Sequence, residues 1–140
     1  MPDESGRKAR TVRPGARQRA EKRGRRGEWL AVTLLVVTGW RIVGRRVKTP
    51  LGEIDIIARK GGTLAFIEVK WRAHEAAARE AFHPRQQARV MRAAAMWRAG
   101  RPGLKALTPR FDLICIVPGS LPRRLTGVIS ADSGPENHLI

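Results

Sequence analysis

The sequence predicts a single α/β domain in which helices cover the faces of a central mixed sheet. Three observations predict this fold: a helical pattern over residues 16–38, three strand-like runs after it, and a second helix that begins at Pro84. A buried strand over residues 110–117 follows, and residues 125–130 form one more, weaker strand. The predicted order is therefore α-β-β-β-α-β, with a further strand at its end.

The predicted elements have recognisable ends. The first helix is basic in its first half and apolar in its second, and Gly39 is a typical C-terminal stop. The first strand, residues 40–47, lies between this glycine and Pro50. The second helix spans residues 84–99, because proline is favoured in a first turn. Its apolar face consists of Val90, Ala94 and Trp97.

The length of the chain allows one domain with one core. We expect residues 1–15 to be a disordered basic arm, residues 16–131 to be the domain, and residues 132–140 to be a frayed tail. Residues 1–26 hold ten basic and three acidic side chains. This charge run is either simply solvated or an arm that grips nucleic acid, and the sequence leaves both interpretations open.

Composition points to a polyanionic partner. The chain has 28 Lys and Arg against 12 Asp and Glu, a net charge of +16, and arginine binds phosphate bidentately. An anionic membrane surface, the competing partner, requires a basic amphipathic helix with a clear apolar face. No secretory signal is visible, and the longest apolar stretch, residues 29–37, is too short to span a bilayer. The single Cys115, in an apolar run, is predicted to fill the core, which fits the reducing cytoplasm.

Two of the strands form a predicted β-hairpin around Gly61 and Gly62. A two-residue turn there places Asp55 opposite Glu68, Ile57 opposite Phe66, and Glu53 opposite Lys70. The other face of the hairpin then forms a core surface, made of Ile54, Ile56, Ala58, Ala65, Ile67 and Val69.

The predicted opposition of Asp55 and Glu68 suggests a metal site. Like charges directly opposite each other are destabilising, and such a pair usually has a cation between its members or a shifted pKa. Two carboxylates with the ammonium group of Lys70 on the same face suit Mg²⁺, which takes one or two carboxylates together with water and phosphate oxygens. The alternative is a surface hairpin whose charges face water.

Other candidates lie on the helices. Glu28 falls in line with the apolar residues of the first helix, as a site group or as a surface residue paired with Arg25 or Arg26. The second helix has a basic stripe that either holds a phosphate backbone or keeps the surface soluble. The stripe consists of Arg85, Arg89 and Arg92.

Several other chemistries find no support in the sequence. The three histidines are scattered and do not have the spacing of zinc ligands. No glycine-rich phosphate loop ends in Lys-Ser or Lys-Thr, and no serine lies in a nucleophile elbow. Among the four tryptophans, only Trp71 has a position that suits stacking on a base, and core packing is its alternative role.

Taken together, Gly-Glu-Ile-Asp and Glu-Val-Lys one hairpin apart resemble the PD-(D/E)XK nuclease superfamily, and most closely the small bacterial YraN-type proteins, an endonuclease-like family. A bare Glu-X-Lys is a weak signal, whereas the combination is specific. The matching segments cover residues from about 24 to 117 in the right order; they are 27–28, 51–58, 66–70, 84–87 and 110–112.

The resemblance implies a restriction-endonuclease-like three-layer core and a set of site residues. It implies that Asp55 and Glu68 are metal ligands, with the Val69 carbonyl as a third, and that Lys70 positions or activates the attacking water. Glu28 matches the first-helix glutamate that often completes such sites. Gln86 or its neighbour Gln87 matches a helix residue near the scissile phosphate. Three departures are Trp71-Arg72 after the lysine, an alanine-rich segment over residues 74–81, and the long basic N-terminal arm, which is extra.

We therefore predict a metal-dependent endonuclease that uses Mg²⁺ or Mn²⁺ and cuts phosphodiester bonds without base specificity. The metal would polarise the phosphate and lower the pKa of bound water. The predicted partner is nucleic acid, DNA rather than RNA, with no membrane, and the oligomeric state is open, a homodimer included. The alternatives are a non-catalytic module that binds branched or single-stranded nucleic acid, and a basic accessory protein of RNA or ribosome assembly that acts by charge alone.

Overall fold

The computed structural model describes residues 14–129, with side chains from residue 24 onward. The predicted C-terminal tail and nearly all of the predicted N-terminal arm lie outside this range. Pro14 and Gly15, assigned to the arm, belong instead to the first helix. Within the described residues, no helix has the length and apolar character needed to cross a membrane.

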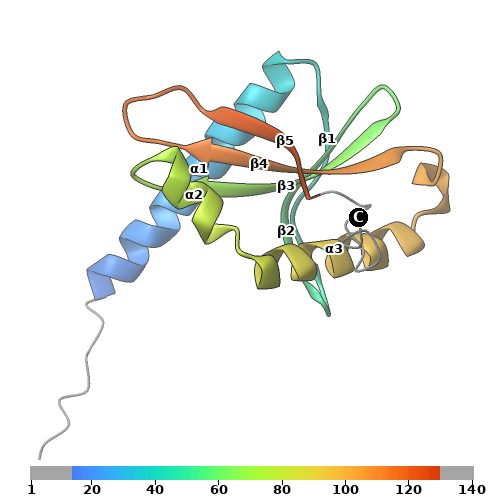
Figure 1. Ribbon diagram of the computed structural model, residues 1–140, viewed down its shortest axis with the longest axis horizontal. Helices are drawn as coiled ribbons and strands as arrows, with labels where there is room; N and C mark the ends of the chain where they lie inside the picture. Colours follow the sequence, from blue (N-terminus) through green and yellow to red (C-terminus); the bar gives the residue numbers. More distant parts are fainter. Residues whose placement is uncertain (1–13, 130–140) are drawn as a thin grey trace, which may run out of the picture.

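The protein has a five-stranded mixed sheet between two layers of helices (Figure 1). The strands lie in the order β1-β2-β3-β4-β5; β3 and β4 are parallel and the other neighbours are antiparallel. This is the restriction-endonuclease-like α/β architecture that the sequence predicts. The elements are α1 (Pro14–Val37), β1 (Arg41–Thr49), β2 (Gly52–Lys60), β3 (Thr63–Trp71), α2 (Glu75–Ala81), α3 (Pro84–Ala99), a 3₁₀ turn (Pro102–Leu104), β4 (Thr108–Ile116) and β5 (Arg123–Ile129).

The sheet separates two apolar cores, one on each face. Helix α1 packs on one face, where Ala31 and Leu35 are fully buried against β2, β3 and β4. Helices α2 and α3 pack on the other, where Phe66 lies 5.5 Å from Phe111 and 6.0 Å from Trp97 between ring centroids. Burial on both faces is expected for strands that helices cover on both sides. The predicted apolar face of α3 is confirmed by the burial of Val90, Ala94 and Trp97.

The predicted ends of α3 are confirmed, but helix α2 was not predicted. Its sequence, Glu-Ala-Ala-Ala-Arg-Glu-Ala, is rich in alanine, the best helix former. His74 caps its N-terminus by accepting a hydrogen bond from the amide of Ala77 at 3.1 Å. Cys115 is fully buried in the α2–α3 core, as predicted.

The predicted hairpin register is confirmed from the Lys60–Thr63 pair as far as the Ile56–Ile67 pair. The predicted distribution of side chains over its two faces is wrong at one position. Ile54 packs in the α2–α3 core, whereas Ile56 packs in the α1 core, so strict alternation fails between them. The strand is therefore irregular at Asp55, which lies between these two isoleucines, and it is regular from Ile56 onward.

Candidate nuclease-like site

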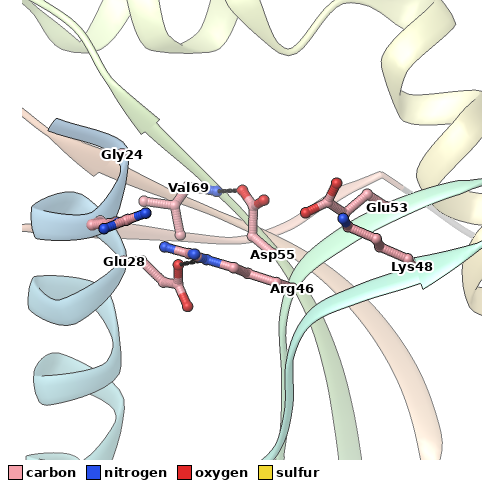
Figure 2. Close-up of a pocket in the computed structure, with 8 residues that line it drawn as sticks. Gly24, Glu28, Arg46, Lys48, Glu53, Asp55 and Val69 are labelled. Atoms are coloured by element: carbon pink, nitrogen blue, oxygen red, sulfur yellow. Dashed lines mark hydrogen bonds and ion pairs between the residues drawn. The ribbon is translucent and has the colours of Figure 1, made fainter. Parts of the chain in front are cut away.

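Strands β2 and β3 stop pairing where the two predicted carboxylates begin. The last paired residues are Ile56 and Ile67. Oδ2 of Asp55 accepts a hydrogen bond of 2.8 Å from the amide of Val69, so a side chain replaces the backbone ladder here (Figure 2). The predicted pairs of Asp55 with Glu68 and of Glu53 with Lys70 therefore do not form. Glu53 pairs instead with Lys48 of β1.

Glu68 lies at the centre of a hydrogen-bonded group that joins β3 to α3. Its Oε1 atom is 3.0 Å from Nζ of Lys70 and accepts a hydrogen bond of 2.8 Å from Nε2 of Gln86. Lys70 lies two residues along the same strand and therefore on the same side. Gln86 is in the first turn of α3, which His83 caps by accepting from the amide of Gln86. The structure thus brings the predicted Glu68, Lys70 and Gln86 together.

Burial raises the pKa of both carboxyl groups. Burial is the main cause that raises the pKa of Glu68, to about 7; the charge of Asp55 adds to it, and Lys70 opposes it. Burial likewise raises the pKa of Asp55, against the Val69 hydrogen bond and Lys70. The two carboxylates lie close together along β3, because Asp55 accepts from the amide of Val69 and Glu68 is the residue before Val69. One added positive charge between them would favour ionisation of both.

Glu28 is buried on α1 and holds two arginines of β1. Its Oε1 accepts a 3.0 Å hydrogen bond from Nε of Arg45, and its Oε2 accepts one of 2.6 Å from Nε of Arg46. Successive side chains of a strand normally point to opposite faces. Arg46 has a φ of 47°, in the left-handed region, and this local break allows both arginines to reach one carboxylate. Of the two alternatives for Glu28, the surface residue paired with Arg25 or Arg26 is therefore excluded.

Glu28, Arg46 and Asp55 line a pocket between α1 and the diverging strands. It has a volume of about 590 Å³, and Figure 2 shows Glu28, Arg46 and Asp55 projecting toward it from three elements. Three carboxylates and three cations lie around it, so charge of both signs meets at one place. The lining residues are Gly24, Arg25, Glu28, Arg46, Lys48, Glu53, Asp55 and Val69.

The donor set at this pocket fits Mg²⁺ or Mn²⁺. Within residues 24–129, no group of three or more His, Cys, Asp or Glu side chains is arranged to hold a metal by protein ligands alone. Mg²⁺ does not need such a group, because it keeps several water molecules and takes one or two carboxylates. The half-buried Asp55 and the buried Glu68, on either side of the Val69 amide, are the two that would hold it.

The remaining predicted residues lie elsewhere. Arg85, Arg89 and Arg92 are exposed on α3, which covers the opposite face of the sheet from α1. Trp71 is half-buried against the α1 core. Sequence reasoning did not assign Arg46 or Lys48 to the site. The sequence of β1 contained one signal for these two residues, because the strand carries four cations and no acid.

The fold defines a small α/β protein with a restriction-endonuclease-like core. The family described as "Uncharacterised protein family UPF0102" matches residues 27–116, and the chain belongs to this family, as its YraN-type resemblance predicted. A UPF0102 protein of Maricaulis maris is 50% identical over 108 residues, which cover 77% of this chain and 85% of the relative. One of Parvibaculum lavamentivorans is 48% identical over 119 residues, which cover 85% and 90%. One of Caulobacter vibrioides is 46% identical over 114 residues, which cover 81% and 91%.

Proposed function

We propose that this protein is a metal-dependent endonuclease that hydrolyses phosphodiester bonds of nucleic acid, preferentially DNA, without base specificity. One observation carries the proposal. The half-buried Asp55 and the buried Glu68 lie on either side of the Val69 amide, Lys70 contacts Glu68, and Asp55 and Val69 line a pocket that also presents cations. Carboxylates for a metal and cations for a phosphate are the two requirements of hydrolysis at a charged phosphodiester.

Asp55 and Glu68 would hold Mg²⁺ or Mn²⁺, with the Val69 carbonyl as a third oxygen ligand. The bound metal supplies Lewis-acid polarisation of the phosphate and a more acidic water. The chain keeps Asp55 ready for this role, because the Val69 amide fixes Oδ2 at 2.8 Å. Gln86 and Lys70 fix Oε1 of Glu68 in the same way. Preorganised ligands of this kind need little rearrangement when a cation arrives.

Lys70 is the residue assigned to the attacking water or to the charge that develops on the phosphate. Its ammonium group contacts Oε1 of Glu68 at 3.0 Å, and the Lys70 side chain is only 13% exposed, so its position is well defined. An ammonium has three donors, and one contact with Glu68 leaves two for other partners. Lys70 thus has the capacity to bind a carboxylate and a water or phosphate oxygen at once.

The cations of the pocket are assigned to the phosphate backbone. Arg25, Arg46 and Lys48 line it, and Glu28 holds Arg46 in place. Their contacts would fix the register of the substrate without reading its sequence. The exposed arginines of α3, Arg89 and Arg92 among them, are assigned to further backbone contacts. No base-specific arrangement is part of this proposal.

The test is a cleavage assay with wild type, Asp55→Asn, Lys70→Ala and Glu53→Gln in Mg²⁺, Mn²⁺ and EDTA. Asparagine retains an oxygen that accepts from the Val69 amide, so Asp55→Asn removes the charge and preserves the fold. Glu53→Gln is the matched control, because Glu53 is an exposed carboxylate of the same pocket. Substrates are supercoiled DNA, single-stranded DNA, forked DNA and structured RNA.

We expect metal-dependent cutting that falls by about 10³-fold or more in Asp55→Asn and by about 10²-fold or more in Lys70→Ala. Glu53→Gln should retain most of the activity. Binding without cutting on every substrate would contradict the proposal and favour a non-catalytic binding module. Equal cutting by wild type and Asp55→Asn would show that the site is assigned wrongly.

A further inference from the structure

Strand β1 forms one edge of the sheet, and its exposed side is basic. The strand carries no Asp or Glu. Its exposed charged side chains are all cations: Arg41, Arg45, Arg46 and Lys48. Arg46 and Lys48, near the end of the strand, line the carboxylate pocket, whereas Arg41 lies at its other end. The cations therefore form a row along this edge of the sheet, in which Arg45 lies on the α1 face and Arg41 on the opposite face.

A second pocket lies at the far end of this row. It has a volume of about 420 Å³ and is lined by Gly39, Arg41, Arg59, Lys60 and Gly61, so three of its five residues are cations and none is an acid. Nζ of Lys60 donates to the carbonyl of Thr38 at 2.6 Å. Within the part of the chain that the structure describes, Arg41 and Arg59 form no ion pair.

Arg41 and Arg59 are directly paired across β1 and β2. Like charges in this position are destabilising unless an anion lies between or beside them. Charges on an edge strand alone have another explanation, because they prevent edge-to-edge aggregation. That explanation does not extend to Arg59 and Lys60, which belong to β2, a strand with a neighbour on each side. An anion bound beside these side chains would explain why cations occur on both β1 and β2.

The length of the row suits a nucleic-acid backbone. Arg41 and Lys48 are seven residues apart along β1, which corresponds to about 23 Å. One strand of duplex DNA places about seven phosphates along that distance. Arginine is the residue best matched to phosphate oxygens, because its planar fork donates two parallel hydrogen bonds. A single small anion would occupy one pocket, whereas a chain of phosphates fits the whole row.

We infer that the basic edge of β1, together with the pocket at Arg41 and Arg59, is a track for the phosphate backbone of nucleic acid. This β1 track extends the substrate path from the carboxylate pocket toward the C-terminal end of α1. The inference rests on the proposed function, because it names where the substrate of that site continues. Glu28 keeps two cations of the track, Arg45 and Arg46, at the junction with the carboxylate pocket.

The test measures binding without cleavage, by fluorescence anisotropy in EDTA, with labelled duplex and single-stranded DNA over a range of salt concentrations. The test variant is Arg41→Gln/Arg59→Gln. The matched control is Arg79→Gln/Arg123→Gln, which removes the same charge near the opposite edge of the sheet. Arg79 and Arg123 are exposed and contact Glu75, a surface ion pair whose loss costs little stability. Thermal unfolding checks that both variants remain folded.

We expect the test variant to bind at least about tenfold more weakly at moderate salt than the control. The slope of log affinity against log salt should also shrink by about two for duplex DNA, because two phosphate contacts are lost. Equal affinity and slope in the two variants would overturn the track. That result, with Asp55-dependent cleavage by the wild type, would leave the proposed nuclease intact.

Absence of nucleic-acid binding by the wild type would overturn both proposals. In that case, binding to vesicles of phosphatidylcholine and phosphatidylserine in equal parts would identify the polyanion as a membrane surface. The binding measurement and the cleavage assay together therefore distinguish failure of the track from failure of the nuclease function.

Discussion

Nε of Arg46 donates a hydrogen bond of 2.6 Å to Oε2 of Glu28, and this contact ties the edge strand β1 to helix α1 beside the carboxylate pocket. Arg46 is the one non-glycine residue with positive φ in the described part of the chain. Strain of this kind persists only where surrounding contacts hold it. The buried carboxylate of Glu28, which Arg45 also contacts, provides such contacts.

Replacement of Glu28 by glutamine should destabilise the protein by about 1–3 kcal/mol, because it leaves two arginines without their shared anion. The arginine side chains are 36% and 49% exposed, so solvent screening keeps the loss below that of a fully buried pair. Chemical denaturation measures the free energy of unfolding. Glu80→Gln, an exposed glutamate of α2, is the control and should be neutral. Equal stability of the two variants would mean that Glu28 does not hold the strand.

The backbone of Arg46 offers a second test. Glycine adopts positive φ without the steric cost that alanine incurs. Arg46→Gly and Arg46→Ala both lose the ion pair with Glu28, so their difference isolates the backbone. We expect the glycine variant to be more stable than the alanine variant by about 1 kcal/mol in denaturant unfolding. Elsewhere in a strand the order is reversed, and finding alanine the more stable would contradict the left-handed conformation at this position.

The raised pKa of Glu68 predicts that stability falls as pH rises. The folded protein holds a proton on Glu68 up to about pH 7, whereas the unfolded chain releases it near 4.5. Between these values the folded state binds more protons, so the free energy of unfolding decreases with increasing pH. The raised pKa of Asp55 acts in the same direction. Denaturation in EDTA across this range, compared with Glu68→Gln, should show an extra loss of about 1–3 kcal/mol in the wild type.

Gln86 is expected to act through Glu68. Its Nε2 donates to Oε1, and loss of this bond removes one of the two contacts that favour the ionised carboxylate. We expect Gln86→Ala to lower the affinity for Mg²⁺ by about tenfold near neutral pH, and by less in alkaline buffer. The rise in melting temperature on addition of Mg²⁺ measures this effect. Gln87→Ala is the control, since Gln87 donates to the carbonyl of Phe82 instead. The same loss in both variants would contradict a specific role for Gln86.

The order of the strands and of the two long helices, and most of the hairpin register, followed from the sequence because they depend on local patterns. The Gly61–Gly62 turn and the alternating runs beside it correctly predicted five residue pairs between β2 and β3, as far as Ile56 and Ile67. The next step failed, because the Asp55 side chain competes with the backbone for the Val69 amide. Alternation alone does not express that competition.

Other features of the site and fold were not predicted, either because they depend on tertiary structure or because a visible sequence signal was not used. Arg46 carries no sequence signal for a left-handed backbone, since arginine is not a residue that favours it. The assignment of Glu28 to Arg45 and Arg46 depends on how α1 lies against β1, which no local pattern defines. Helix α2 differs, because its alanine-rich sequence and the cap at His74 were visible and were not interpreted as a helix.

The central claim is that Asp55 and Glu68 form a site for a divalent cation. The most direct measurement is calorimetric titration of Mg²⁺ and Mn²⁺ into wild type, Asp55→Asn and Glu53→Gln at a pH of about 8, where Glu68, with its pKa of about 7, is ionised. We predict saturable binding heat in the wild type, nearly the same heat in Glu53→Gln, and none in Asp55→Asn. Equal heat in all three proteins, or none in the wild type, would contradict the account.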